Sequence, residues 1–175
     1  SACWSPTAWA GTYVSLRSTS APKAGVRHLM KARSPEWEAL KIENQRRRLE
    51  FAQKLTFEEK LTLAKIWVDS HFQKDNLSEF KKADNRVASC LFDASVGFEI
   101  IALIWGVGLD EEKYSYLGVV VEDFLSIHGE DVVGQIEALV SKDASFIKVL
   151  RFVYRNTMPE DVHRRVCALA GGNNA

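Results

Sequence analysis

Cysteine is scarce in this chain, and its three cysteines, Cys3, Cys90 and Cys167, lie far apart. None forms a CxxC or Cys/His pattern that could hold zinc, so the spacing predicts reduced thiols and no metal site. Walker A, GxGxxG, HExxH and GxSxG motifs are missing too. We therefore find no signature of nucleotide binding, metalloprotease chemistry or serine hydrolysis, and we expect no cofactor and no catalytic residues.

Long apolar runs are also missing. The longest, Ile100–Leu109, is bounded by Glu99 and Asp110 and is too short to cross a bilayer, so we expect no direct membrane insertion. The chain has 175 residues, of which 46% are hydrophobic and 26% charged. These values are typical of a single globular domain that buries a real core.

Acidic residues are absent from the first 35 positions, which contain five Lys and Arg residues and many Ser and Thr. The remaining chain carries 18 basic and 23 acidic residues, a net charge of −5. A basic, hydroxyl-rich and acid-free N-terminus is typical of an organelle transit peptide or of the stretch that follows one. It favours a mitochondrial or plastid address over secretion, with an ordinary basic tail as the alternative.

Helix-start signals recur along the rest of the chain. Ser34-Pro35 predicts a helix to about Leu55, and the capping box Thr56–Glu59 predicts a second to about Phe72. Further starts are expected near Asn76, Asp110, Glu130, Asp143 and Thr157. We place a turn between helices around residues 93–97. The β-branched run Val119–Val121 lies within a 3.6-residue apolar pattern and is expected to be helical.

The helix starts are regularly spaced. Those near Asn76, Asp110 and Asp143 are separated by 34 and 33 residues, and each interval holds two helical stretches. This is the period of helix-hairpin repeats, whose units stack to bury their apolar faces. The sequence therefore predicts an all-α fold of stacked helix hairpins, with an ordinary helical bundle as the alternative. The expected core comprises Trp67, Leu91, Phe98, Leu117, Val121, Phe124, Ile136, Leu139 and Leu150.

Two carboxylates, Asp93 and Glu99, interrupt apolar runs. A buried carboxylate pair could perform acid–base chemistry, but we favour a helix cap for Asp93 or an ion pair with a neighbouring basic side chain. Basic residues cluster at 46–48, at 81–86 and at 164–165. Because residues 36–175 are net acidic, we expect these clusters to form salt-bridged, solvated faces and not an RNA-binding groove.

The segment 1–33 lacks helical periodicity but is rich in aromatic and basic residues. We expect an extended arm that lies against a partner subunit, with aromatic anchors and with cations near acidic groups. The alternative is that the arm folds back onto its own domain. The predicted partner-binding residues are Trp4, Trp9, Tyr13, Arg17, Lys23 and Arg27.

From about Ala32 to Gly171 the chain resembles the euglenozoan-specific extra subunit of the mitochondrial ATP synthase F1 head. The resemblance is carried by residues 36–41, 60–69, 80–84, 93–99, 116–122 and 153–157. It implies a pentatricopeptide-like helical protein, bound to the outside of the α subunit on the matrix side of the inner membrane. It also implies that the subunit has no nucleotide site of its own.

Together these features predict a basic arm over residues 1–33, a helical-repeat domain over 34–172 and a tail over 173–175. The expected fold is a pentatricopeptide- or tetratricopeptide-like right-handed solenoid with an extended N-terminal arm. The expected function is that of a non-catalytic structural subunit of the F1 sector, whose partners are the ATP synthase α subunit and the F1 head. An organellar RNA-binding helical-repeat protein is the alternative.

Overall fold

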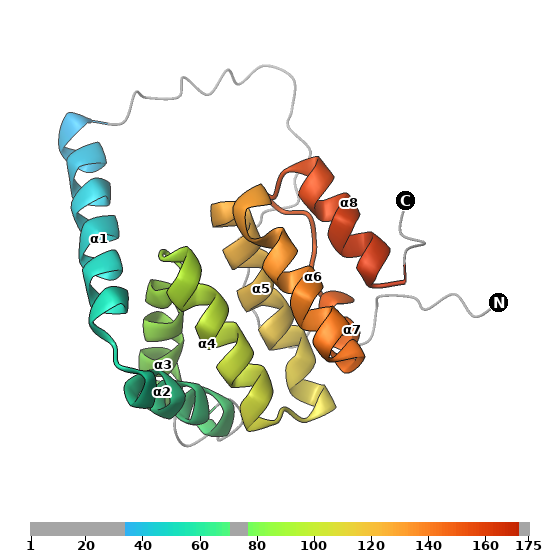
Figure 1. Cartoon of the computed structure of the whole chain (residues 1–175). Coiled ribbons are helices and arrows are strands. Elements are labelled where there is room, and N and C mark those ends of the chain that lie inside the picture. Colours follow the sequence, from blue (N-terminus) through green and yellow to red (C-terminus); the bar gives the residue numbers. More distant parts are fainter. Residues whose placement is uncertain (1–33, 71–76, 172–175) are drawn as a thin grey trace, which may run out of the picture. The chain divides into compact units, whose positions relative to one another are not determined.

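The computed structural model describes residues 34–70 and 77–171, and within these ranges every regular element is helical (Figure 1). The α-helices are α1 (Pro35–Lys54), α2 (Phe57–Ser70), α3 (Leu77–Cys90), α4 (Ala94–Val107), α5 (Tyr114–His128), α6 (Glu130–Lys142), α7 (Ile147–Leu150) and α8 (Glu160–Leu169). The short 3-10 helices η2 (Glu111–Lys113) and η3 (Ala144–Phe146) precede α5 and α7. The prediction of an all-α fold is confirmed for these residues.

Side-chain caps start two of the helices, and the sequence indicates both capping residues, Thr56 and Asp93. The backbone N–H of Thr56 donates to Glu59 Oε2 at 2.8 Å, and Thr56 Oγ1 accepts from the N–H of Glu59 at 3.3 Å. Asp93 Oδ1 accepts from the N–H groups of Ser95 and Val96, each at 3.0 Å. These bonds satisfy backbone donors that have no partner within the helix, which explains why α2 and α4 begin there.

Two predicted details are wrong. The turn expected at residues 93–97 lies earlier, at residues 91–93, because the Asp93 cap lets the helix begin at Ala94. Asp110 precedes η2 without a capping side-chain hydrogen bond, and α5 begins only at Tyr114. The C-terminal end of α5 is as expected: Gly129 adopts a φ of 54°, a conformation that glycine adopts without strain.

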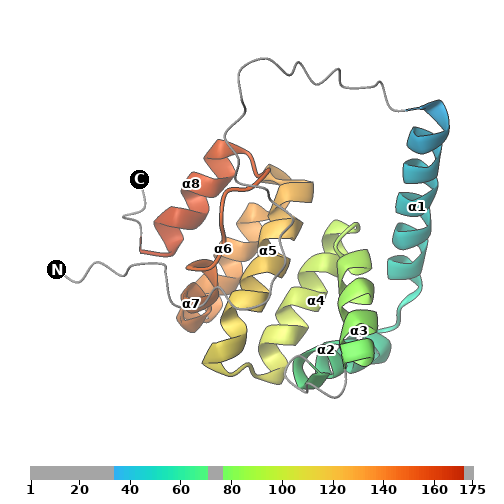
Figure 2. The same cartoon turned by 180° about the vertical axis from the view of Figure 1, so that it is seen from behind.

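The helices pack with their next-but-one neighbours as well as with adjacent ones (Figures 1 and 2). Helix α1 contacts α3, and α5 contacts α7. In the same way, α2 contacts α4, α4 contacts α6, and α6 contacts α8. Among adjacent helices, α2 packs extensively against α3, and α4 packs against α5. The result is one continuous core from α1 to α8 within the compact unit Pro35–Ala175.

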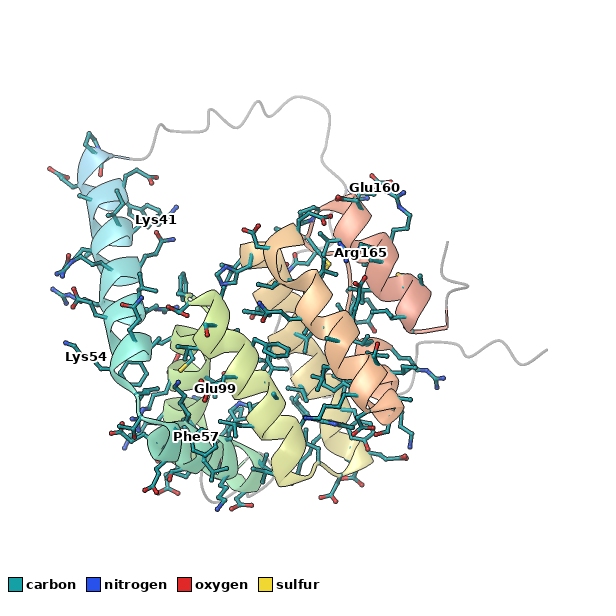
Figure 3. The ribbon with its side chains drawn as sticks, viewed as in Figure 1. Lys41, Lys54, Phe57, Glu99, Glu160 and Arg165 are labelled. Carbon is teal, nitrogen blue, oxygen red and sulfur yellow. The ribbon has the colours of Figure 1, made fainter. Side chains whose placement is uncertain are left out.

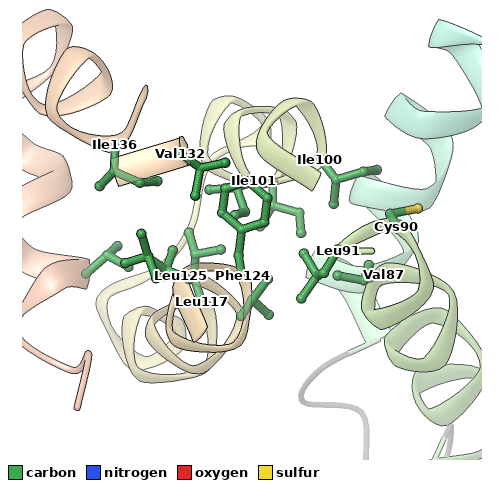
Figure 4. Close-up of a cluster of buried hydrophobic side chains, with 14 of the residues drawn as sticks. Val87, Cys90, Leu91, Ile100, Ile101, Leu117, Phe124, Leu125, Val132 and Ile136 are labelled. Carbon is green, nitrogen blue, oxygen red and sulfur yellow. The ribbon is translucent and has the colours of Figure 1, made fainter. Parts of the chain in front are cut away.

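The centre of the core lies between α3, α4, α5 and α6, where Phe124 meets Leu91, Ile101 and Val132 (Figure 4). Each side chain of this size contributes about 1.5–3 kcal/mol when fully buried. Seven of the nine predicted core residues are buried, namely Trp67, Leu91, Leu117, Val121, Phe124, Ile136 and Leu150. Phe98 and Leu139 are only partly buried, packed against the edge of the core.

Candidate protein-binding surface

The predicted partner-binding residues of the N-terminal arm lie outside the described part of the chain. This applies to Trp4, Trp9, Tyr13, Arg17, Lys23 and Arg27, and also to the proposed boundary of the arm at residue 33. The candidate surfaces of the described residues lie on the helical unit.

The two carboxylates that interrupt apolar runs have structural partners, as we favoured from the sequence. Asp93 caps α4, and its carboxylate also accepts a hydrogen bond from Gln53 Nε2 at 3.1 Å. The N–H of Val96, the Gln53 amide and the N–H of Ser95 lower the pKa of Asp93. Glu99 of α4 pairs with Lys60 Nζ of α2 at 2.6 Å. Both carboxylates therefore tie helices together.

Three basic residues of the predicted clusters, Arg46, Arg47 and Arg165, are paired with acids. On α1, Arg46 and Arg47 both bind Glu43, at 2.8 Å each, and these bonds lower the pKa of Glu43 to about 2. On α8, Arg165 reaches Glu130 and Glu137 of α6 (Figure 3). Cations held in this way are less available to phosphate groups, which weakens the case for a nucleic-acid groove.

The described residues form no cluster of metal ligands, and the thiol of Cys90 is buried. No group of three or more His, Cys, Asp or Glu residues within 34–70 and 77–171 is placed to hold a metal ion. Burial raises the pKa of Cys90 to about 11, so this thiol stays protonated and unreactive at neutral pH. None of the helices described has the length and apolar character needed to cross a membrane.

Helix α1 exposes large apolar side chains. Its C-terminal part packs on the core through Ala52 and Phe51, but Trp37, Leu40 and Ile42 are 43%, 58% and 65% exposed. Trp37 and Leu40 lie at helical spacing on the same face as Phe51 and Ala52, so the apolar stripe continues beyond the packed part. Lys41 lies over the Trp37 ring, 4.2 Å from its centroid.

A hollow of about 270 Å³ lies between α3 and α5. Its lining combines apolar side chains with a few polar groups, from Arg48, Ala88, Leu91, Phe92, Asp123, Ser126, Ile127 and Thr157. Both Arg48 and Phe92 line the hollow, and the guanidinium group of Arg48 lies 5.2 Å from the centroid of the Phe92 ring. His128 Nε2 lies 2.8 Å from the carbonyl oxygen of Leu91 and ties α5 to the end of α3.

An exposed stripe on α5 runs past this hollow. Tyr116, Val119, Asp123 and Ile127 recur at helical spacing, and all four are exposed. Beside the stripe, Tyr154 is 67% exposed and donates its backbone N–H to Glu122 Oε2 at 3.0 Å. This surface, which we call the α5 stripe, has apolar side chains on both sides of one carboxylate.

Sequence reasoning missed the hollow and the α5 stripe. One signal was present, since Glu122 and Asp123 together interrupt the apolar run from Leu117 to Leu125, as Asp93 interrupts an earlier one. Comparison with protein-family models, with curated proteins and with solved structures gives no match for this chain.

Proposed function

We propose that this chain is a non-catalytic structural subunit that binds another protein, and that its partner is the α subunit of the mitochondrial ATP synthase F1 head. The proposal that the chain binds a protein rests on one observation about α1. This helix packs on the core by one end and exposes Trp37, Leu40 and Ile42 along the rest. Exposed large apolar side chains on one element are typical of interaction sites. The identity of the partner follows from the sequence resemblance.

The packing pattern supports a helical-repeat interpretation of the fold. If α1–α2, α3–α4, α5–α6 and α7–α8 are four hairpins, the contacts of α1 with α3 and of α5 with α7 join first helices of successive hairpins. Contacts of α2 with α4, of α4 with α6 and of α6 with α8 join the second helices. Stacked hairpins of this kind create an extended face suited to holding a partner, as in pentatricopeptide- and tetratricopeptide-like solenoids.

A peripheral position on the matrix side of the inner membrane fits this function, because such a subunit needs only the F1 head to hold it there. The acid-free N-terminal segment fits import into mitochondria. RNA binding is less favoured, since Arg46, Arg47 and Arg165 each pair with carboxylates.

The test measures binding of the full chain to purified F1 heads and to isolated α subunit. Replacing Leu40 and Ile42 together by Ser should leave thermal unfolding unchanged, since both side chains are exposed, but should weaken binding at least tenfold. The matched control replaces Asn44 and Gln45, exposed on the same helix, by Ser and should bind like the wild type.

Two results would reject the proposal. One is that the wild-type chain binds neither F1 heads nor the α subunit. The other is that the chain is recovered from mitochondria with RNA and released by nuclease, which would favour the organellar RNA-binding alternative.

A further inference from the structure

We propose that the hollow between α3 and α5 receives a lysine or arginine side chain from a partner protein, whose apolar neighbours cover the α5 stripe. This inference rests on the proposed protein-binding function but does not depend on which protein is the partner. It assigns the binding of a cationic side chain to the hollow, which is separate from the exposed Trp37, Leu40 and Ile42 of α1.

Asp123 is the acidic residue that lines the hollow. Within the described residues its carboxylate makes no hydrogen bond or ion pair, although it borders the hollow. The charged neighbours that act on it, Glu122 and Asp84, are both acidic. Partial desolvation and these two carboxylates raise the pKa of Asp123. A carboxylate in this setting lacks a counter-charge, and an incoming cation would supply one.

Ser126 also lines the hollow. Its Oγ is buried and has no hydrogen-bond partner among the described residues. A buried hydroxyl normally has a hydrogen-bond partner, and an unsatisfied one destabilises the folded state. An ammonium or guanidinium group carries several donors, so it could bond to Asp123 directly, and it could reach the buried Ser126 Oγ only after the side chains that cover that atom shift.

The size and lining of the hollow suit one long side chain. At about 270 Å³ the hollow is at the small end for a drug-sized ligand or cofactor, which usually takes about 300–1,000 Å³, but it can hold one long side chain. Leu91 and Ile127 offer apolar surface for the methylene stem of such a side chain. Outside the hollow, the exposed side chains of Val119 and Tyr154 offer apolar contact to the residues that flank the lysine or arginine in the partner.

Charge selects the cation over an anion. A phosphate or carboxylate ligand would approach Asp123 with Glu122 and Asp84 close by, and like charges repel at this range. Arg48, which also lines the hollow, lies over the Phe92 ring. The hollow is therefore expected to discriminate between lysine- and glutamate-bearing segments of otherwise equal composition.

The first experiment tests the hollow without the F1 head. The isotope-labelled full chain is titrated with acetyl-Leu-Lys-Leu-amide, and with the same peptide carrying Gln or Glu in place of Lys. We expect the lysine peptide to shift the backbone amide signals of residues 88–92 and 123–127. Asp123→Asn should abolish these shifts, whereas Asp69→Asn, which alters an exposed carboxylate at the end of α2, should keep them.

The second experiment measures binding of the same variants to F1 heads. Asp123→Asn should weaken binding at least tenfold, while its thermal unfolding should be no lower than that of the wild type. Equal shifts with the Gln or Glu peptide, shifts that persist in Asp123→Asn, or unchanged F1 binding of that variant would each overturn the inference. If lysine-specific shifts occur but the wild-type chain does not bind F1 heads, the assignment of the partner fails and the hollow stands.

Discussion

Two glycines of α4 show how local packing decides what one residue can be. A Cβ atom on Gly97 would lie 2.7 and 2.9 Å from ring carbons of Phe124 and 3.2 Å from Leu91 Cα. The Phe124 ring is fully buried, so it has little room to move away. A Cβ on Gly106 would meet nothing within 4 Å.

We predict opposite effects of alanine at these two positions. Gly97→Ala should lower the free energy of unfolding by about 1–3 kcal/mol, the usual cost of overpacking. Gly106→Ala should raise it by up to about 1 kcal/mol, because alanine loses less backbone entropy than glycine in a helix. Urea unfolding of the two variants measures both values. Similar effects at both positions would show that Phe124 does not pack on Gly97 as described.

The Asp93 cap should contribute stability that depends on pH. Asp93→Ala removes the acceptor for two helix N–H groups and should cost about 1 kcal/mol at pH 7. Because folding lowers the pKa of Asp93, its contribution is present above the ordinary aspartate pKa and is lost as pH falls through the folded-state value. The difference between wild type and variant should therefore shrink below about pH 4.

Unfolding titrations at pH 7 and pH 3 measure this change. Asp110→Ala provides the control, since Asp110 also precedes a helical turn but makes no capping bond, and its effect should stay within about 0.5 kcal/mol. A difference for Asp93→Ala that stays constant on acidification would contradict the proposed cap.

At the scale of elements, one arginine holds α8 against α6. Arg165 donates from Nε and Nη2 to the two carboxylate oxygens of Glu137, both at 2.8 Å, and from Nη1 to Glu130 at 2.9 Å. This parallel pair of bonds needs the planar fork of a guanidinium group, which lysine lacks.

We therefore predict that Arg165→Lys loosens α8 selectively. Hydrogen exchange of the α8 amides should become faster, while exchange in α4 and α5 should stay as in the wild type. Arg164→Lys is the matched control, because Arg164 is exposed one position earlier on the same helix. If both variants leave α8 exchange unchanged, apolar packing through Val162 and Val166 is sufficient to hold the helix.

The elements that sequence analysis located well are those with a local signal. The capping box at Thr56 and the helix end at Gly129 each depend on a few adjacent residues, and both occur where expected. Asp110 has the right residue type for a cap, but its side chain pairs with Lys113 and makes no capping bond, and the regular helix starts later. Helix α7 has only four residues, too short for its periodicity to stand out.

At the scale of the whole molecule, the hollow could not be predicted from the sequence. Its residues come from positions as distant as Arg48, Leu91, Asp123 and Thr157, and no local pattern shows that they meet. The periodic spacing of helices did indicate that α3 and α5 occupy equivalent places in successive hairpins. It did not indicate that a hollow bordered by the Asp123 carboxylate lies between them.

The last prediction concerns the N-terminal segment, which the structure does not describe. The unit Pro35–Ala175 has its own buried core, so deleting residues 1–30 should leave its thermal unfolding almost unchanged. If the segment carries the predicted aromatic anchors, the same deletion should weaken binding to F1 heads, because a few such side chains usually dominate an interface. Trp4→Ala combined with Trp9→Ala should reproduce much of the loss. Replacing Ser5 and Thr7 by Ala should not.

Calorimetry and a binding titration of these variants separate two roles of the segment. Weaker binding at an unchanged unfolding temperature would place it at the partner interface, in addition to α1 and the α5 stripe. A markedly lower unfolding temperature with normal binding would instead make residues 1–30 part of the protein's own core. In that case the partner contacts would lie on the helical faces, where Leu40, Ile42 and Asp123 are the residues to test first.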